Sequence, residues 1–269
     1  LKQSAAKLML WEWRPAFLSR SEQRGTRSTV VSGQPYSIIA RTPEVLGKQI
    51  GRSLENCGVA KEDIDEQSLL SELGTRGIGL ASLVTMGHSQ SMGALGFYFA
   101  FKSLEAWEQG AQANEIRCVV PMDAVFPLLD ALAEGAKTVD EQKRADLICL
   151  KATLDVDGCA RLILQPVEVK ARSEQSASFP NRTNAVLADP LQQLKSTRNL
   201  LSAISRNLTA SQGNLHLVNA ALATLLEAAL SLRPAGPGRS PANDIKLLCA
   251  ASNGLIELST TEGILLWFQ

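Results

Sequence analysis

The N-terminal part of the chain carries an apolar repeat with helical spacing. It extends from residue 43 to about residue 107 and begins with apolar side chains four positions apart, at Leu46, Ile50 and Leu54. Side chains three or four residues apart share one face of an α-helix. A break at 87–92 is followed by a strongly apolar segment at 93–108. The pattern therefore predicts a helical region followed by one further apolar helix.

Short runs rich in β-branched residues predict strands, and longer apolar repeats between them predict helices. The hairpin signal is Asp157-Gly158, because glycine accepts the positive φ that a tight turn needs. We expect strands at 36–40, 116–122, 145–154 and 160–171, helices at 124–136, 188–210 and 214–232, and two or three closing strands around 244–250, 253–259 and 262–268.

This order of elements predicts a mixed α/β fold, with a central mixed β-sheet flanked by helices. Residues 1–30 combine Trp and Pro with a Ser/Arg/Gly-rich stretch, which is typical of a connector. We divide the chain into a connector and helical region at 1–87 and an α/β domain at 88–269.

Composition narrows the class of protein. The chain has 27 basic and 27 acidic residues, and this zero net charge argues against a uniformly basic DNA coat protein but not against an enzyme with a local basic groove. Its five cysteines are scattered without C-x-x-C, and its two histidines are isolated, so we expect no zinc site and a reducing, cytoplasmic location. No segment resembles a membrane span or a secretory signal. We expect both ends to continue into a longer protein.

Candidate chemistry lies in the predicted hairpin. Glu168 and Lys170 are two residues apart, which on a strand places a carboxylate and an ammonium on one face, roughly 7 Å apart. Asp146 opens the preceding apolar strand, where an unpaired carboxylate would be costly. Two carboxylates that bind a divalent ion, together with a lysine, suit metal-assisted phosphodiester hydrolysis. The alternative is an ordinary polar alternation on a half-solvated strand.

The hairpin register decides between these readings. A two-residue turn at Asp157-Gly158 would place Asp146 opposite Val169 and Glu168 on the other side of the sheet. A three-residue loop at 157–159 would place Asp146 opposite Lys170 and Ile148 opposite Glu168, so that the polar groups share a face. A bulge near Pro166 would have the same effect. We therefore predict an offset hairpin.

An Asp on one strand and Glu-x-Lys on the next, with a helix on either side, is similar to the pattern of the PD-(D/E)XK nuclease superfamily, over residues 90–215. The resemblance implies a restriction-endonuclease-like core with an N-terminal helical extension. It implies that Asp146 and Glu168 bind Mg²⁺ or Mn²⁺ and that Lys170 is the catalytic lysine. Region 43–110 resembles parts of large bacterial ATPases of anti-phage and restriction systems, which implies a DNA substrate and further modules or subunits of a defence complex as partners.

Several other residues are candidates for such a site, and each has a plainer interpretation. Glu105 would supply a carboxylate from the preceding helix or be a solvated surface residue. Asp123 would approach the site or cap the helix at Ala124, and we favour the cap. Gln193, or Gln192, would match the glutamine of RecB-type relatives or lie on the helix surface, with Thr197 where such relatives carry tyrosine. Phosphate contacts are expected from Arg172, Lys195 and Arg198, with Arg182 and Arg206 nearby, unless these form a solvated face.

We therefore expect a metal-dependent DNA endonuclease or exonuclease domain. The first alternative is a module that retains the nuclease fold for DNA binding or assembly without cleavage. The second is an interaction domain built on the Ala/Leu-rich helices at 188–232. P-loop, dinucleotide-binding and G-x-S-x-G motifs are absent from the sequence.

Overall fold

The chain divides into two compact units, residues 1–91 and 92–269. In the first unit, β1 (Leu8–Trp13) pairs antiparallel with β2 (Tyr36–Arg41). Strand β2 confirms the prediction at 36–40, whereas β1 lies in a segment that we expected to be a connector. Most of the predicted helical repeat at 43–87 lies outside the described residues. The computed structural model describes residues 8–13, 36–41, 51, 54–55, 69, 72, 88–112, 114–133, 144–171, 183–210, 215–232 and 240–268.

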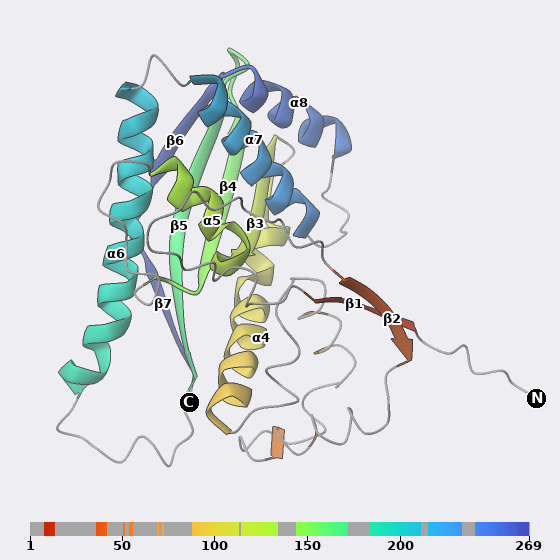
Figure 1. The fold of residues 1–269 in the computed structure, drawn as a ribbon, viewed down its shortest axis with the longest axis vertical. Helices are drawn as coiled ribbons and strands as arrows, with labels where there is room; N and C mark the ends of the chain where they lie inside the picture. Colours follow the sequence, from red (N-terminus) through yellow and green to blue (C-terminus); the bar gives the residue numbers. More distant parts are fainter. Residues whose placement is uncertain are drawn as a thin grey trace, which may run out of the picture. The chain divides into compact units, whose positions relative to one another are not determined.

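A mixed β-sheet forms the centre of the second unit, which confirms the predicted α/β class (Figure 1). Strands β3, β4 and β5 form an antiparallel meander. Strands β6 and β7 both pair parallel with β5, β6 with its first half and β7 with its second half. The strands are β3 (Glu115–Pro121), β4 (Leu147–Leu154), β5 (Ala160–Ala171), β6 (Ile256–Thr260) and β7 (Ile264–Phe268).

Four helices bury one face of this sheet. They are α5 (Met122–Leu132), α6 (Thr183–Ala210), α7 (Leu215–Leu232) and α8 (Pro241–Ser252). In Figure 1, α5 and α7 cross in front of the strands and α6 runs beside β6 and β7. Alternate strand residues such as Ile148, Leu150 and Leu164 form a buried core with leucines of these helices. Successive strand residues point to opposite faces of the sheet. The core residues therefore show which face each of the remaining strand residues lies on.

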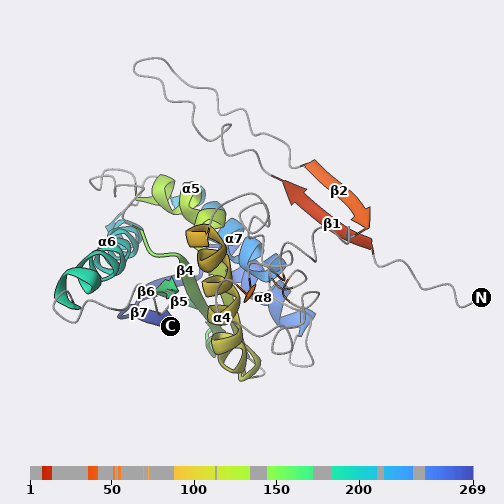
Figure 2. The same ribbon diagram turned by 90° about the horizontal axis from the view of Figure 1, so that it is seen from below.

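Helix α4 (His88–Gln109) packs against the opposite face of the sheet. A Cβ atom at Gly96 would lie 2.9 Å from Ala171 Cβ and 3.3 Å from Val169 Cγ1, so the helix and β5 approach closely there. In the view of Figure 2, α4 and α6 lie on either side of the strands. The helix begins at His88, so the break predicted at 87–92 is wrong for residues 88–92. The polar residues of this segment are compatible with a helix, and Gly93 lowers helix stability by only about 1 kcal/mol relative to alanine.

The segment predicted as a strand at 244–250 is helical. Helix α8 has Pro241 in its first turn and buries Leu247, Ala250 and Ala251 at helical spacing. Its end is closed by Gly254 with φ +79°, after which Leu255 donates its N–H to the Ala250 carbonyl at 2.9 Å. These end signals outweigh the short apolar run. Strands β6 and β7 confirm the other two closing strands, with shorter bounds.

The remaining predicted elements of the second unit are confirmed in type, with shifted ends. Helix α5 begins at Met122, two residues earlier than expected, and α6 begins at Thr183 rather than 188. In the part of the chain that the structure describes, no helix is long and apolar enough to cross a membrane.

Candidate functional site

The β4–β5 hairpin has the offset on which the candidate site depends, in the direction opposite to the one predicted. Leu154 pairs with Ala160, and Asp155 and Cys159 close the loop through an N–H to carbonyl bond of 3.0 Å. The loop is therefore Val156–Gly158 rather than 157–159. Gly158 has φ +79°, which is typical of a three-residue hairpin with a glycine bulge.

The side chain of Asp155 explains why the loop forms at this place. Its Oδ1 accepts the N–H groups of Asp157 at 3.0 Å and of Cys159 at 2.9 Å, and its carbonyl accepts the N–H of Gly158 at 3.2 Å. Aspartate commonly organises a turn in this way. Asp157 and Gly158 are thus the last two residues of the loop, and the Asp155 carboxylate determines where the loop begins.

This register corrects the predicted pairs but keeps the predicted face. Ile148 lies opposite Pro166 rather than Glu168, and pairing runs without interruption along the hairpin, so there is no bulge at Pro166. Continuing the register by one residue places Asp146 opposite Glu168, not Lys170. The difference is two residues, and a shift of two leaves side chains on the same face. Asp146, Glu168 and Lys170 therefore come together on the face covered by α6.

Asp146 is held through both its backbone and its side chain. Its carbonyl accepts the N–H of Met122 at 2.9 Å, where β3 passes into α5. Its carboxylate oxygen Oδ2 accepts the N–H of Val169 at 2.9 Å. The backbone pairing of β4 with β5 ends at Leu147 and Val167. The Asp146 side chain therefore accepts the N–H of Val169, which lies beyond the last of these backbone pairs.

Glu168 is completely buried, and its carboxylate forms an ion pair with Lys170. The Lys170 side chain is 27% exposed, so it reaches from the buried carboxylate toward solvent. The ion pair with Lys170 is made by Oε1, whereas Oε2 has no hydrogen-bond donor among the described residues. A buried carboxylate with unused acceptor capacity is costly unless further positive charge neutralises it.

The pKa values of the two carboxyl groups reflect this shortage of positive charge. Burial and the charge of Asp146 together raise the pKa of Glu168 to about 7, against the opposing effect of Lys170. Burial also raises the pKa of Asp146, against the Val169 hydrogen bond and the charge of Lys170. Neighbouring carboxyls that resist simultaneous ionisation bind a divalent cation readily, since the ion stabilises both charged forms.

Two of the additional candidates lie outside this arrangement. Glu105 is on the exposed surface of α4, where it contacts Lys102 at 3.3 Å and Gln109 at 3.0 Å, and α4 packs on the other face of the sheet. Asp123 is 83% exposed and pairs with Arg144 at 2.6 Å. The predicted cap at Asp123 is wrong, because α5 begins at Met122, so that Asp123 lies inside the helix and Pro121 is its cap. The charge of Asp123 nevertheless contributes to the raised pKa of Asp146.

The predicted candidates on α6 are half-buried or exposed. Gln193 is half-buried, one turn before Thr197, and Gln192 is exposed. Lys195 and Arg198 are exposed, with one guanidinium nitrogen of Arg198 3.9 Å from Glu262. Arg172 and Arg182 lie outside the described residues, so the predicted contacts of these two arginines stay a prediction.

Two buried polar contacts were not expected from the sequence. Thr197 Oγ1 accepts the N–H of Ala145 at 2.8 Å, and Glu108 Oε1 accepts the N–H of Val119 at 2.7 Å. Both side chains come from helices and accept backbone N–H groups of other segments, 52 and 11 positions away in the sequence. Helical periodicity places both residues on a helix, but nothing local in the sequence identifies their partners.

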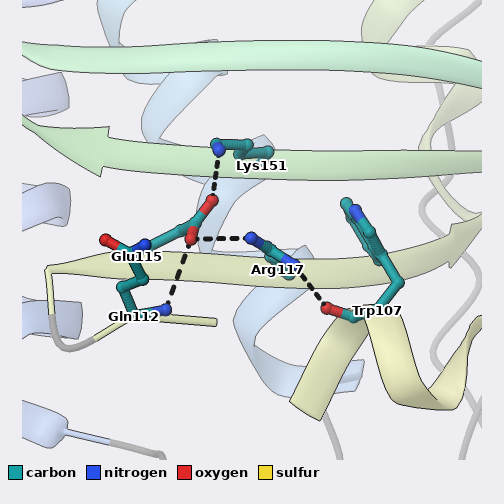
Figure 3. Close-up of polar contacts among 5 residues, drawn as sticks. All are labelled: Trp107, Gln112, Glu115, Arg117 and Lys151. Carbon is teal, nitrogen blue, oxygen red and sulfur yellow. Dashed lines mark hydrogen bonds and ion pairs between the residues drawn. The ribbon is translucent and has the colours of Figure 1, made fainter. Parts of the chain in front are cut away.

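A second polar cluster lies on the α4 side of the sheet, formed by Glu115, Arg117 and Lys151 (Figure 3). Glu115 contacts Arg117 at 3.0 Å, forms an ion pair with Lys151 and accepts the Gln112 N–H at 3.3 Å. Burial favours the protonated form of Glu115, but these donors outweigh it and lower its pKa to about 2. Because two cations already neutralise this carboxylate, the cluster is suited to holding β3, β4 and α4 together rather than to binding a metal.

Arg117 also connects the second cluster to helix α4. It donates to the Trp107 carbonyl at 3.0 Å, and its guanidinium lies 5.6 Å from the centre of the Trp107 ring. A Glu-x-Arg alternation on β3, with a lysine on the next strand, is the sequence signal that could have indicated it.

Within the described ranges, no group of three or more His, Cys, Asp or Glu side chains is placed to hold a metal. The candidate site thus rests on the Asp146 and Glu168 carboxyls. No family model, curated protein or solved structure matches this chain.

Proposed function

We propose that residues 92–269 form a metal-dependent phosphodiesterase domain that acts on DNA. The observation that carries the proposal is the meeting of Asp146 and Glu168 on neighbouring strands, with Lys170 on the same face. Their carboxylate oxygens are the ligand type that Mg²⁺ and Mn²⁺ prefer. Mg²⁺ is commonly held by one or two carboxylates, with water and substrate as its other ligands.

The donor set fits such an ion. Oε2 of Glu168 is buried without a hydrogen-bond donor among the described residues, and the pKa values of both carboxyls are raised. When bound, a divalent ion would activate water and stabilise charge on the phosphate oxygens. Asp146 and Glu168 would hold it, while Lys170, the partly exposed member, would orient the attacking water or contact the phosphate.

Helix α6 supplies positive charge suited to a nucleic-acid backbone. Lys195 and Arg198 are exposed on the helix that covers the site face, and Arg206 is exposed two to three turns further on. Phosphate contacts of this kind provide affinity without sequence preference. In this proposal they position the strand rather than take part in the chemistry.

Cleavage of supercoiled plasmid in Mg²⁺ or Mn²⁺ tests the activity. Asp146→Asn, Glu168→Gln and Lys170→Met should each lower the rate at least about a hundredfold, because each removes a metal ligand or a charge at the reacting phosphate. Glu105→Gln is the matched control on α4 and should cleave like the wild type. Equal cleavage by the wild type and all three site variants would indicate a contaminant and contradict the proposal.

Binding of DNA in EDTA tests the α6 surface separately. Lys195→Ala and Arg198→Ala should each weaken binding of a short duplex and make its dependence on salt less steep, by roughly one unit per lost phosphate contact. Lys102→Ala, on the opposite side of the sheet, is the control. Unchanged affinity and salt dependence in both α6 variants would remove this surface from the proposal.

One observation favours a second candidate function, a nuclease-fold module that binds DNA without cleaving it. Glu168 is completely buried and already paired with Lys170, and the described residues provide no third carboxylate. Such a module would bind the duplex in EDTA through α6 but neither cleave it nor show heat on titration with Mn²⁺. Measurable Mn²⁺ binding that Asp146→Asn abolishes would favour the enzyme.

A further inference from the structure

Thr197 links α6 to the backbone immediately before Asp146. Its Oγ1 accepts the N–H of Ala145 at 2.8 Å, and both residues are buried, with Thr197 at 0% and Ala145 at 1% exposure. The two residues are 52 positions apart in the sequence. The contact therefore depends on the packing of α6 over the end of β4.

The Thr197 hydroxyl accepts a backbone N–H that no strand of the sheet accepts. Strand β4 begins at Leu147, so the N–H of Ala145 lies outside the β3–β4 and β4–β5 ladders. A buried N–H without an acceptor costs about 1–3 kcal/mol. Thr197 removes that cost only while Ala145 keeps its present position, and it thereby selects one path for the chain entering β4.

Asp146 is thus held at three successive points. Thr197 holds the N–H of the residue before it, Met122 donates to its carbonyl, and Val169 donates to its carboxylate. Of these three contacts, the one from Thr197 comes from the helix that also carries Lys195 and Arg198. The turn of α6 that presents cations outward therefore also holds the strand end on its inner side.

We infer that Thr197 is a positioning residue for Asp146, which couples α6 to the metal-binding carboxylates. The inference rests on the proposed function for its consequence, metal binding, but its geometric content can be tested without metal. Residues that orient metal ligands without contacting the ion typically change affinity ten- to a hundredfold when replaced. Thr197→Val removes the hydroxyl with little change of volume, and Thr197→Ser keeps the hydroxyl.

The first measurement is amide hydrogen exchange by NMR in EDTA. In Thr197→Val, exchange at Ala145 should accelerate, and exchange at Val169 should accelerate at least about tenfold, because the Asp146 carboxylate that accepts its N–H is less well held. Leu150, in the buried middle of β4, serves as the reference for global opening. Thr197→Ser should restore the exchange of Val169. Thr224→Val, which removes an exposed hydroxyl that is bonded within α7, should leave Val169 unchanged.

The second measurement is calorimetric titration with Mn²⁺, where Thr197→Val should bind at least about tenfold more weakly and Thr197→Ser like the wild type. Acceleration at Ala145 alone, with Val169 and Mn²⁺ affinity unchanged, would overturn the inference and leave Thr197 a structural residue. Failure of the wild type to bind Mn²⁺ would count against the proposed function, while Val169 exchange still decides the positioning role. Should Thr197→Val not fold, loss of Val169 protection in Thr197→Ser would overturn the inference, since that variant retains the hydroxyl.

Discussion

Val169 donates its backbone N–H to Asp146 Oδ2 at 2.9 Å, so the side chain of the residue that precedes β4 satisfies a backbone donor of β5. The same carboxylate is one of the two proposed metal ligands. Its structural and functional roles can be separated, because amide and carboxylate oxygens both accept a hydrogen bond but only the carboxylate carries charge.

Replacement of Asp146 should separate these roles through stability. Asp146→Ala leaves the N–H of Val169 without its acceptor and should lower the free energy of unfolding by about 1–3 kcal/mol. Asp146→Asn keeps an oxygen acceptor and removes a charge whose burial is unfavourable, so it should cost less than about 1 kcal/mol. Urea denaturation at pH 7 in EDTA measures both, with the exposed Asp189→Asn as control. Equal losses in the Ala and Asn variants would mean that the hydrogen bond contributes little.

Glu168 should make the protein less stable as the pH rises through the neutral range. Its pKa is raised from 4.5 to about 7 by burial and by Asp146, so between about pH 5 and pH 7 the folded state retains a proton that the unfolded chain releases. The free energy of unfolding therefore falls over this range. Glu168→Gln cannot ionise and should gain about 2 kcal/mol relative to the wild type between pH 5 and pH 8.

Urea denaturation in EDTA at pH 5, 6, 7 and 8 measures this gain. Glu105→Gln is the exposed control and should follow the wild-type curve. A difference between wild type and Glu168→Gln that does not change with pH would show that Glu168 has an ordinary pKa.

Glu115 should have the opposite effect, at lower pH. Its pKa is lowered to about 2 because Arg117, Lys151 and the Gln112 N–H outweigh its burial, so the stabilisation is present above about pH 4.5 and is lost as the pH falls toward 2. Glu115→Gln should lower the free energy of unfolding by about 2 kcal/mol at pH 7 and much less at pH 3. Denaturation curves at the two pH values measure it. Equal losses at both would mean that the cations do not stabilise the charged form.

Gly96 should tolerate a methyl group poorly, in contrast to Gly93 on the same helix. A Cβ at Gly96 would lie 2.9 Å from Ala171 Cβ, whereas nothing lies within 4 Å of one at Gly93. Gly93→Ala should stabilise by up to about 1 kcal/mol through helix propensity. Gly96→Ala gains the same propensity but crowds β5, and should be destabilising overall by about 1–2 kcal/mol. Thermal denaturation compares the stability of the two variants. Adding Ala171→Gly to Gly96→Ala should restore part of the lost stability, because it removes the methyl group that is crowded. A Gly96→Ala variant more stable than the wild type would contradict the close packing.

Local sequence patterns were sufficient for most of the helices and strands of the second unit. Short runs joined by the Asp157-Gly158 turn signal predicted β4 and β5, and longer apolar segments predicted α6 and α7, because length and turn residues distinguish strands from helices. Residues 244–250 show the limit of this reasoning. A short apolar run fits either state, and the helix there is decided by its end signals and by burial of Leu247 and Ala250 against the sheet.

The candidate site was predicted as a set of residues but not as a geometry. The sequence by itself determined that Glu168 and Lys170 share a face of β5, since strand residues two apart always do, and that Asp146 opens the preceding strand. Only the tertiary structure decided that Asp146 lies opposite Glu168. That register follows from the hydrogen bonds of Asp155 within the loop. The backbone before β4 is also held by Thr197, which contacts Ala145, and by Val169, which contacts Asp146; these partners are 52 and 23 positions apart in the sequence. Contacts at such separation are products of packing, and no local pattern encodes them.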